Sequence, residues 1–234
     1  MSTPTRPRRL VVTLSGRRLP RSLGALLRAL GDDGTPELHA MFIEDSDLLK
    51  AVSLPFAFEF CVATSARRPI DRARIEAHLR SDAAAAERDL AELARASGLS
   101  WRFEIVRERS RTVVTRALAV TDAVIVTPHG ETNPGDASRD IVCIAEDDEA
   151  GARARAVAGA LATAEHLPLE DYHLAAATPA PGVTGHVLSA TAVPGILRRP
   201  GHRLVVINGA LIETLDASVH DLAEISTAPL VIVR

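Results

Sequence analysis

The chain has 234 residues, of which 47% are hydrophobic and 24% are charged, and its formal net charge is −3. This composition predicts a soluble globular protein with an ample core, and it provides no bulk positive charge for binding nucleic acid. No apolar run approaches the roughly 20 residues of a membrane-spanning helix. The two cysteines show no metal-binding or CxxC spacing, so we expect a reduced, cytoplasmic protein.

The first 130 residues alternate apolar strands with amphipathic helices. We expect strands at Arg9–Ser15, Glu37–Ile43, Ser100–Val106 and Asp122–Thr127. We expect helices from Ser22 to Leu30, over Asp71–Ser97 and over Thr112–Ala119. Near the C-terminus, the apolar runs Leu204–Ile207 and Leu230–Val233 lack polar alternation, which is typical of a parallel sheet covered by helices on both faces.

The segment Leu48–Ala63 is unusual because it contains three of the five phenylalanines of the chain. Phe56, Phe58 and Phe60 alternate with other residues, which predicts either a short strand or a flap over the edge of the sheet. Two interpretations remain open. Either these side chains pack against the following helix, or the stretch Leu54–Phe60 is a contact surface for a homodimer, another protein partner or a membrane.

A second series of strands and helices follows the turn-rich stretch His129–Arg139. The expected elements are strands at Asp140–Ala145, Tyr172–Ala177, Leu204–Ile207 and Leu230–Val233, and a helix at Glu149–His166. A weak helix near 187–197 is expected to be interrupted by Pro194. We therefore predict two degenerate repeats that pack as a pseudo-dimer, at residues 1–130 and 139–234, with residues 131–138 as the linker. The first repeat lacks a fifth strand.

Three stretches of the chain resemble the universal stress protein family in a tandem-repeat form. They are LHAMFIEDSDLL after the second strand, the alanine-rich helix before SWRFEIVRE, and the C-terminal DASVHDLAEISTAPLVIVR. The resemblance covers nearly the whole chain. It implies an α/β fold with open parallel sheets and helices on both faces, of the Rossmann-like or adenine-nucleotide α-hydrolase-like type. Many members of that family dimerise, and some bind ATP.

The ATP-binding members of that family hold phosphate with a glycine pattern after the fourth strand, where backbone N–H groups close on phosphate oxygens. This chain departs from the pattern. His129 and Gly130 lack a later Gly-Ser or Gly-Thr at the needed spacing, bulky residues follow Gly209, and an alanine precedes Ser218. We therefore expect no cofactor. If ATP does bind, the resemblance points to these same four residues as its contacts.

The sequence shows no recognisable catalytic or metal-binding arrangement. It contains no GxSxG, P-loop or GxGxxG pattern, and its histidines share no metal-ligand spacing. The acidic cluster of Glu44, Asp45 and Asp47 predicts either a cation or sugar site, or the start of a helix. The alternating arginines of the range Arg107–Arg111 predict either an anion site or an exposed connection.

The sequence favours a non-catalytic protein of the universal stress type, which acts in a stress response or in regulation through ligand sensing or protein partners. An alternative is a nucleotide- or small-molecule-binding enzyme of the adenine-nucleotide α-hydrolase-like group. Its altered phosphate loop would use Gly209, Ser218 and acids such as Glu146, and a deep pocket would lie at the carboxyl ends of the strands with His129 or Asp45 directed into it. A third hypothesis is a structural adaptor that docks through Leu54–Phe60.

Overall fold

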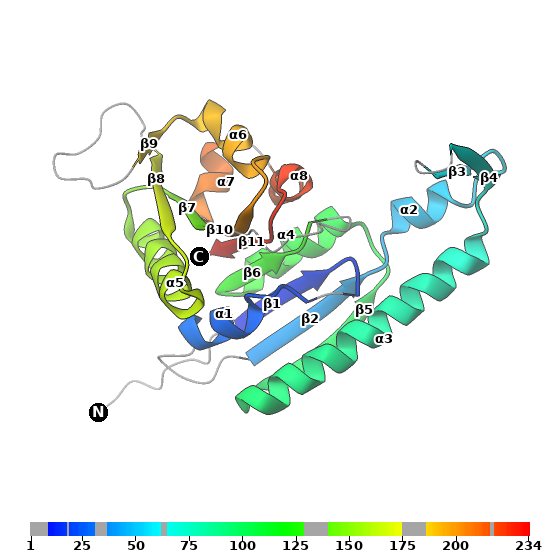
Figure 1. Ribbon diagram of the computed structural model, residues 1–234, viewed down its shortest axis with the longest axis horizontal. Coiled ribbons are helices and arrows are strands. Elements are labelled where there is room, and N and C mark those ends of the chain that lie inside the picture. The colour runs from blue at the N-terminus through cyan, green and yellow to red at the C-terminus, as the bar shows by residue number, and fades with distance from the viewer. Residues whose placement is uncertain are drawn as a thin grey trace.

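One nine-stranded sheet runs through the part of the chain that the structure describes (Figure 1). The computed structural model describes residues 9–17, 19–30, 37–61, 65–128, 140–174, 186–215 and 218–234. The strands of this sheet are β1 (Arg9–Leu14), β2 (Glu37–Ile43), β5 (Ser100–Val106), β6 (Ala123–Val126), β7 (Asp140–Ala145), β8 (Leu169–Leu174), β9 (His186–Leu188), β10 (His202–Asn208) and β11 (Leu230–Val233).

The order of the strands is β5-β2-β1-β6-β11-β10-β7-β8-β9. Neighbouring strands are parallel except β6 and β11, which pair antiparallel with Leu230 opposite Val126. The expected open α/β sheet is thereby confirmed. Among the strands of this sheet, the first half has the order β5-β2-β1-β6, which are its third, second, first and fourth strands. Read from the other edge of the sheet, the second half repeats this pattern as β9-β8-β7-β10, and β11 is its added fifth strand. The division into two repeats stays a prediction, and the expected linker 131–138 lies outside the described residues.

Helices cover both faces of the sheet. They are α1 (Leu23–Leu30), α3 (Arg72–Ser97), α4 (Ser110–Val120), α5 (Glu149–Glu165), α6 (Val193–Leu197), α7 (Ala210–Thr214) and α8 (Val219–Ile225). Buried side chains of α1, α3 and α5 form one apolar cluster with the sheet, and those of α4, α6, α7 and α8 form a second cluster on the opposite face. No helix in the described residues is long and apolar enough to cross a membrane.

The continuous apolar runs of the central strands follow from this two-sided cover. Successive side chains of a strand point to opposite faces of the sheet. In β1, Leu10 and Val12 belong to the cluster under α1, whereas Val11 belongs to the cluster under α4. All four residues of β6 and all four of β11 are buried, so the junction between the two halves lies in the interior of the molecule.

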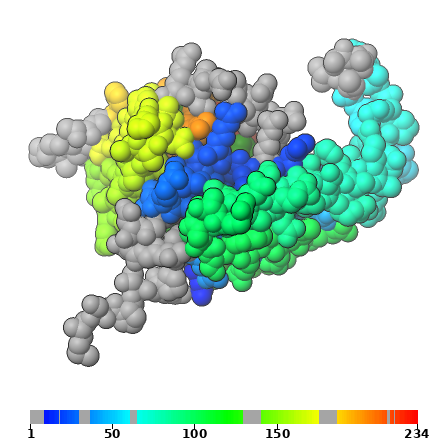
Figure 2. All heavy atoms as spheres, turned by 60° about the horizontal axis from the view of Figure 1, so that its bottom comes forward, coloured from blue at the N-terminus to red at the C-terminus, as the bar shows by residue number. Residues whose placement is uncertain are grey.

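An arm projects from one end of the sheet (Figures 1 and 2). We use this name for α2 (Ser46–Ala51), the connecting residues 52–57, the hairpin of β3 (Phe58–Cys61) and β4 (Ala66–Pro69), and the N-terminal half of α3. The 26 residues of α3 span about 39 Å at the usual helical rise. Its buried residues begin only at Ala83, because the preceding turns extend beyond the sheet.

Several local expectations are refined by the structure. Of the alternating phenylalanines, Phe58 and Phe60 lie in a separate two-stranded hairpin and Phe56 lies in the turn before it, and all three are exposed. The strand expected from Tyr172 begins three residues earlier, at Leu169. Pro194 does not break a helix, because it lies in the first turn of α6, where a backbone N–H has no helical partner.

Candidate functional site

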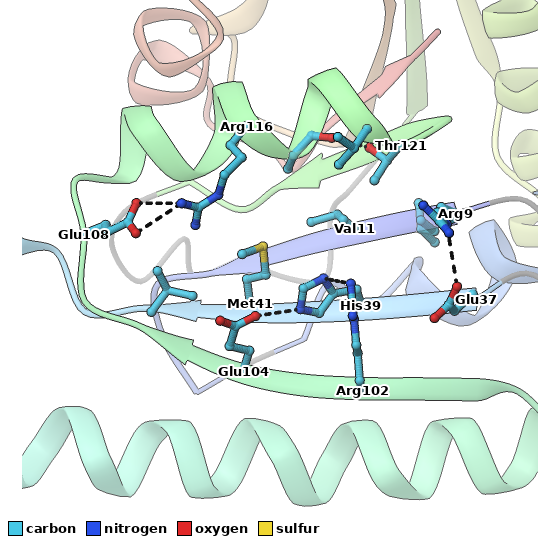
Figure 3. Close-up of a pocket in the computed structure, with 14 residues that line it drawn as sticks. Arg9, Val11, Glu37, His39, Met41, Arg102, Glu104, Glu108, Arg116 and Thr121 are labelled. Atoms are coloured by element: carbon cyan, nitrogen blue, oxygen red, sulfur yellow. Dashed lines mark hydrogen bonds and ion pairs between the residues drawn. The ribbon is translucent and has the colours of Figure 1, made fainter.

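A groove with a volume of about 530 Å³ runs along the face of β2 and β5 beside α4 (Figure 3). It extends from Arg9 and Glu37 at the start of the strands to Glu108, just past the end of β5. In the second half of the sheet, α6, α7 and α8 all pack on this face, whereas the first half has α4 alone among the described elements. The groove is the uncovered part of that face, and its volume suits a small molecule.

His39 is the centre of a chain of hydrogen bonds in this groove. Its Nδ1 atom lies 2.9 Å from Nη2 of Arg102, and its Nε2 atom lies 3.1 Å from Oε2 of Glu104. An arginine can only donate, so Nδ1 accepts and the Nε2–H group donates to Glu104. Burial, and then the charge of Arg102, lower the pKa of His39 below its ordinary value. The neutral imidazole that this arrangement requires is therefore favoured at neutral pH.

Two other arginines at the groove are paired with carboxylates. Nη1 of Arg116 lies 3.2 Å from both carboxylate oxygens of Glu108, and Nε of Arg9 lies 3.8 Å from Oε2 of Glu37. Together with Arg102 and Glu104, the groove presents three cations and three anions around a neutral histidine. Its net charge is balanced.

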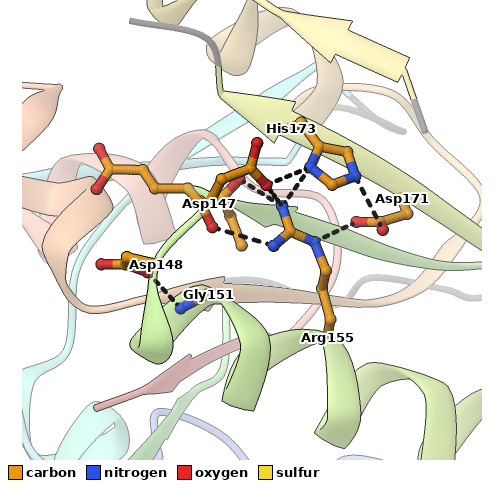
Figure 4. A network of polar contacts seen from close by, with 8 residues as sticks. Asp147, Asp148, Gly151, Arg155, Asp171 and His173 are labelled. Atoms are coloured by element: carbon orange, nitrogen blue, oxygen red, sulfur yellow. Dashed lines mark hydrogen bonds and ion pairs between the residues drawn. The ribbon is translucent and has the colours of Figure 1, made fainter. Parts of the chain in front are cut away.

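A second polar cluster lies at the carboxyl ends of β7 and β8, around Arg155 of α5 (Figure 4). Its Nε donates to Oδ1 of Asp171 at 3.3 Å, and its Nη1 and Nη2 atoms donate to the carbonyl oxygens of Glu146 and Ala145, each at 3.0 Å. Nη2 also lies 3.2 Å from Oδ1 of Asp147. All three nitrogens of the guanidinium group are thus engaged within the protein.

His173 completes this cluster. Its Nδ1 atom lies 2.6 Å from Oδ1 of Asp147 and 2.7 Å from Nη2 of Arg155, and its Nε2 atom lies 3.4 Å from Oδ2 of Asp171. The side chain of His173 is only 10% exposed. The cluster therefore holds together the loop after β7, the end of β8 and α5, because its polar groups bind one another.

The acids that follow β7 also begin α5. Asp148 is the N-cap of this helix, and its Oδ1 atom accepts a hydrogen bond of 2.6 Å from the backbone N–H of Gly151. Only glycine fits at position 151, because a β-carbon there would collide with the carbonyl oxygen of Glu146. Asp148 and Glu149 thus have a structural role, since negative charge stabilises the positive, N-terminal end of a helix dipole.

The structure engages Gly209 and Ser218, two of the predicted nucleotide contacts, in the fold itself. The backbone N–H of Gly209 donates to the carbonyl oxygen of Val233 at 2.8 Å. Ser218 is the N-cap of α8 and forms a capping box with Asp221. His129 and Gly130 lie outside the described residues. A role of these four residues in nucleotide binding stays a prediction.

Asn208 is an unexpected feature at the end of β10, directly before Gly209. Its side chain is fully buried, and neither the Oδ1 nor the Nδ2 atom has a hydrogen-bond partner in the described part of the chain. Buried amides are almost always hydrogen-bonded. Asn208 is therefore an exception at the carboxyl end of β10, a buried amide whose two polar atoms are both unpartnered.

The acidic cluster and the alternating arginines, which the sequence left as separate candidate sites, lie together at the base of the arm. Oε2 of the buried Glu44 is 2.7 Å from Nη2 of Arg107, and Oδ2 of Asp47 is 3.0 Å from Nε of Arg109. Oδ2 of Asp45 accepts hydrogen bonds from the N–H and the hydroxyl of Ser110, and its Oδ1 atom caps α2.

These contacts also account for the protonation state of Asp45. Burial acts to raise the pKa of its carboxyl group, but the hydrogen bonds from Ser110, Asp47 and Leu48 together lower it below the usual range. The acids and arginines at the base of the arm satisfy one another, so they form a structural joint. No group of three or more metal-ligating side chains occurs in the residues that the structure describes.

The arm exposes the aromatic side chains that the sequence singled out. Phe56, Phe58 and Phe60 are 69%, 42% and 62% exposed, and Leu48 and Leu54 are each 48% exposed. The guanidinium of Arg67 lies 4.0 Å above the ring of Phe58. Packing of these phenylalanines against α3, the first of the two interpretations, is therefore not what the structure shows.

The fold has counterparts among solved structures. No family model and no curated protein matches the chain. A universal stress protein from Archaeoglobus fulgidus DSM 4304 is 11% identical, with a TM-score of 0.46 and 96% of each chain covered. The cytoplasmic domain of a prokaryotic cation chloride cotransporter is 12% identical, with a TM-score of 0.45, over 97% of this chain and 95% of that domain.

A third counterpart is a protein of unknown function from Pseudomonas aeruginosa PAO1. It is 10% identical, with a TM-score of 0.44, over 97% of this chain and 92% of its own. A universal stress protein is thus among the solved structures that resemble this chain, as the sequence led us to expect. At these identities and scores the matches assign no activity and no binding residue.

The groove and the residues that form it were not predicted from the sequence. His39 stands in the apolar strand ELHAMFI, and Arg102 and Glu104 alternate with Trp101 and Phe103 in SWRFEIV. Polar side chains on one face of two strands predict that this face is not fully covered. That signal was present, but it becomes specific only once β2 and β5 are known to be neighbours.

Proposed function

We propose that this chain is a non-catalytic protein of the universal stress type, which acts in the cytoplasm in a stress response or in regulation through protein partners. The observation that supports this proposal is the projecting arm with its five exposed apolar side chains. Large exposed apolar patches on soluble proteins mark interaction sites. We propose that the first partner is a second copy of the chain, which docks arm to arm.

Hydrogen bonds and ion pairs hold the arm in shape, so its apolar side chains are displayed in a defined arrangement. Glu59 of β3 pairs with Arg68 of β4 and, at 2.6 Å, with Arg74 of α3. Arg72 of α3 donates to Oγ of Ser53, just after α2, at 3.0 Å. An ordered apolar surface loses less conformational entropy on binding than a mobile one.

The area of the arm is sufficient for a second copy. Five large apolar side chains that are about half exposed offer roughly 500 Å² per copy, since each presents on the order of 200 Å² in total. A reciprocal contact would bury about 1,000 Å², which is the lower limit for a specific interface. The commonest oligomers are two-fold dimers in which the same patch is used by both subunits.

Light scattering of the purified protein over a range of concentrations tests the proposal. We expect a dimer for the native chain and a monomer with an unchanged circular dichroism spectrum for Phe56→Ser/Phe58→Ser. The matched control is Leu169→Ser/Val187→Ser, which removes two exposed apolar side chains from the other end of the sheet. A native chain that is monomeric at all concentrations, or a dimer that survives the arm substitutions, would refute arm-to-arm docking.

A second candidate function is supported by Asn208. Its unpartnered, buried amide lies at the carboxyl end of β10, where ligands bind in open α/β sheets. This is the location of a nucleotide or another small molecule in the enzyme alternative. We propose that ATP does not bind, because the N–H of Gly209 and the hydroxyl of Ser218 already form hydrogen bonds within the fold.

A thermal-shift experiment separates the two candidates. At a hundred times its dissociation constant, a ligand stabilises the folded state by about 2.7 kcal/mol, which is a readily measured increase in melting temperature. We expect no shift with ATP, ADP or AMP, with or without magnesium. A clear shift with ATP that is lost in Asn208→Leu would transfer support to the nucleotide-binding alternative.

A further inference from the structure

We propose that the groove beside α4 binds a small organic monocarboxylate, with its carboxylate on Arg102 and its apolar body over Met41 and Val120. This inference is independent of the docking of the arm, and it concerns a site on the face of the sheet instead of the carboxyl ends of the strands.

Arg102 provides the binding group. A guanidinium group has five N–H donors in a planar fork that matches a carboxylate. One Nη2–H of Arg102 is directed to Nδ1 of His39, and among the described residues Arg102 forms no ion pair with a carboxylate. Arg9 and Arg116, by contrast, have Glu37 and Glu108 beside them. Arg102 is therefore the arginine of the groove whose charge is not offset by a neighbouring carboxylate and that has N–H donors left for a ligand.

His39 positions Arg102 without neutralising it. Because Nδ1 of His39 accepts from Arg102, the imidazole is neutral and its Nε2–H holds Glu104. The carboxylate of Glu104 thereby contacts the Nε2 side of the His39 ring, whereas the guanidinium group of Arg102 contacts the Nδ1 side (Figure 3). A ligand carboxylate on Arg102 meets a full positive charge next to a neutral ring.

The rest of the groove selects the class of anion. Val11, Met41 and Val106 are each less than 10% exposed and form an apolar floor, and Val120 of α4 is 58% exposed on the wall. Apolar surface of this kind favours the burial of a hydrocarbon body. The carboxylates of Glu104 and Glu108 at the margins repel a second negative charge. An apolar monoanion therefore fits better than a phosphate or a dicarboxylate.

Calorimetric titration with 4-phenylbutyrate tests this inference, with 4-phenylbutanamide as the uncharged analogue. We expect saturable binding of the acid with a dissociation constant on the order of 1 mM or below, as is usual for a ligand of this size. The amide should bind at least tenfold more weakly. Equal binding of acid and amide, or no binding of the acid at 10 mM (roughly ten times that constant), would overturn the inference.

Two variants locate the binding. Arg102→Gln should weaken binding of 4-phenylbutyrate at least tenfold, and the matched control Arg88→Gln, on the exposed side of α3, should leave it unchanged. Val120→Asp keeps Arg102 and adds a negative charge at an exposed position of the groove wall, so it should also abolish binding while the protein remains folded. Unchanged affinity in either groove variant would overturn the inference.

Nuclear magnetic resonance provides a readout at the site itself. The imidazole nitrogens of His39, assigned with His39→Gln, should shift in proportion to the occupancy of the groove, because Arg102 contacts Nδ1. An affinity for the acid that falls as the protein concentration rises would instead assign the groove to a second copy of the chain, and would refute the small-molecule site.

Discussion

His39 and His173 lie in two halves of one sheet, and each contacts an arginine and an acid. His39 faces a groove of about 530 Å³, whereas the side chain of His173 is only 10% exposed and lies in a closed cluster. The difference comes from the element that supplies the arginine. Arg102 belongs to the edge strand β5, and Arg155 belongs to α5, which packs directly on β7 and β10.

A histidine, an arginine and an acid thus form a structural cluster in one half and a candidate binding site in the other, according to which elements cover them. All three guanidinium nitrogens of Arg155 are used inside the protein, and its charge faces the carboxylates of Asp147 and Asp171. Arg102 uses one contact to a neutral ring and retains donors. This difference between Arg155 and Arg102 should also appear in the free energy of unfolding.

The largest expected effect concerns Arg155. Arg155→Met leaves the acids and carbonyl groups of a mostly buried cluster without their partner, and we expect a loss of about 2–3 kcal/mol in the free energy of unfolding. Arg102→Met, at an exposed site, should cost no more than about 1 kcal/mol. Urea denaturation followed by circular dichroism measures both values. Equal losses in the two variants would contradict the distinction.

Asn208 should show an effect of intermediate size and of opposite sign. Replacing a buried amide that lacks partners with leucine removes an unsatisfied polar group, so Asn208→Leu should increase the free energy of unfolding by about 1 kcal/mol in the absence of ligand. Ser226→Ala is the control, since the buried hydroxyl of Ser226 donates to the carbonyl of Ala228 at 2.7 Å, and its loss should destabilise by about 1 kcal/mol. Destabilisation by Asn208→Leu would show that the amide has partners in solution.

His39 should make a smaller contribution that depends on pH. Its pKa is lower in the folded protein than in the unfolded chain, so the unfolded chain takes up the proton first as the pH falls below about 6.5. The native protein should therefore lose stability as the pH falls from 7 until His39 is also protonated in the folded state.

The variant His39→Gln should lack this loss, and the difference between variant and native protein is measured by denaturation at a series of pH values. His78→Gln, at an exposed position of α3, is the control and should follow the native protein. A native protein that becomes more stable over this range, relative to His39→Gln, would contradict the assigned tautomer.

The last prediction is that two probes of unfolding, one in each half of the sheet, report the same free energy of unfolding. Trp101, the only tryptophan, reports on β5 in the first half, and Cys143 is fully buried in β7 of the second half. Burial raises the pKa of the Cys143 thiol to about 12, so it should react with iodoacetamide only after unfolding.

In a Cys61→Ala background, we expect tryptophan fluorescence and cysteine labelling to give the same free energy of unfolding. The reason is that β6 and β11 join both halves in one buried sheet. Two separate transitions would show that residues 1–130 and 139–234 unfold as independent domains.

The sequence predicted most elements of the fold. The apolar runs of β1, β6, β10 and β11 and the periodicity of α3 are local signals, because a strand or helix buries its side chains at a fixed spacing. The antiparallel pairing of β6 with β11 was not predictable. It depends on which edges of the two halves are free to meet, and no pattern within either strand encodes that choice.

Of the candidate sites, the sequence identified residue types but not their neighbours. Glu44 and Arg107 were two separate candidates, and the structure shows that they are one ion pair. The aromatic stretch around Phe56 was correctly singled out, and only the structure shows that its side chains are exposed. His39 was not predicted as a site residue, because one polar residue in an apolar strand carries no specific signal until Arg102 and Glu104 are known to lie beside it.

The sequence alone thus determined the α/β class and the positions of most strands and helices. It also showed the departure from the glycine pattern of nucleotide binding, because spacing and residue type along the chain suffice for these conclusions. The tertiary structure decided which polar groups are satisfied and which remain free. Hydrogen bonds and burial depend on residues far apart in the chain. Among the described elements, no helix covers β2 and β5 on the face that carries α4, and this leaves Arg102 available in an open groove.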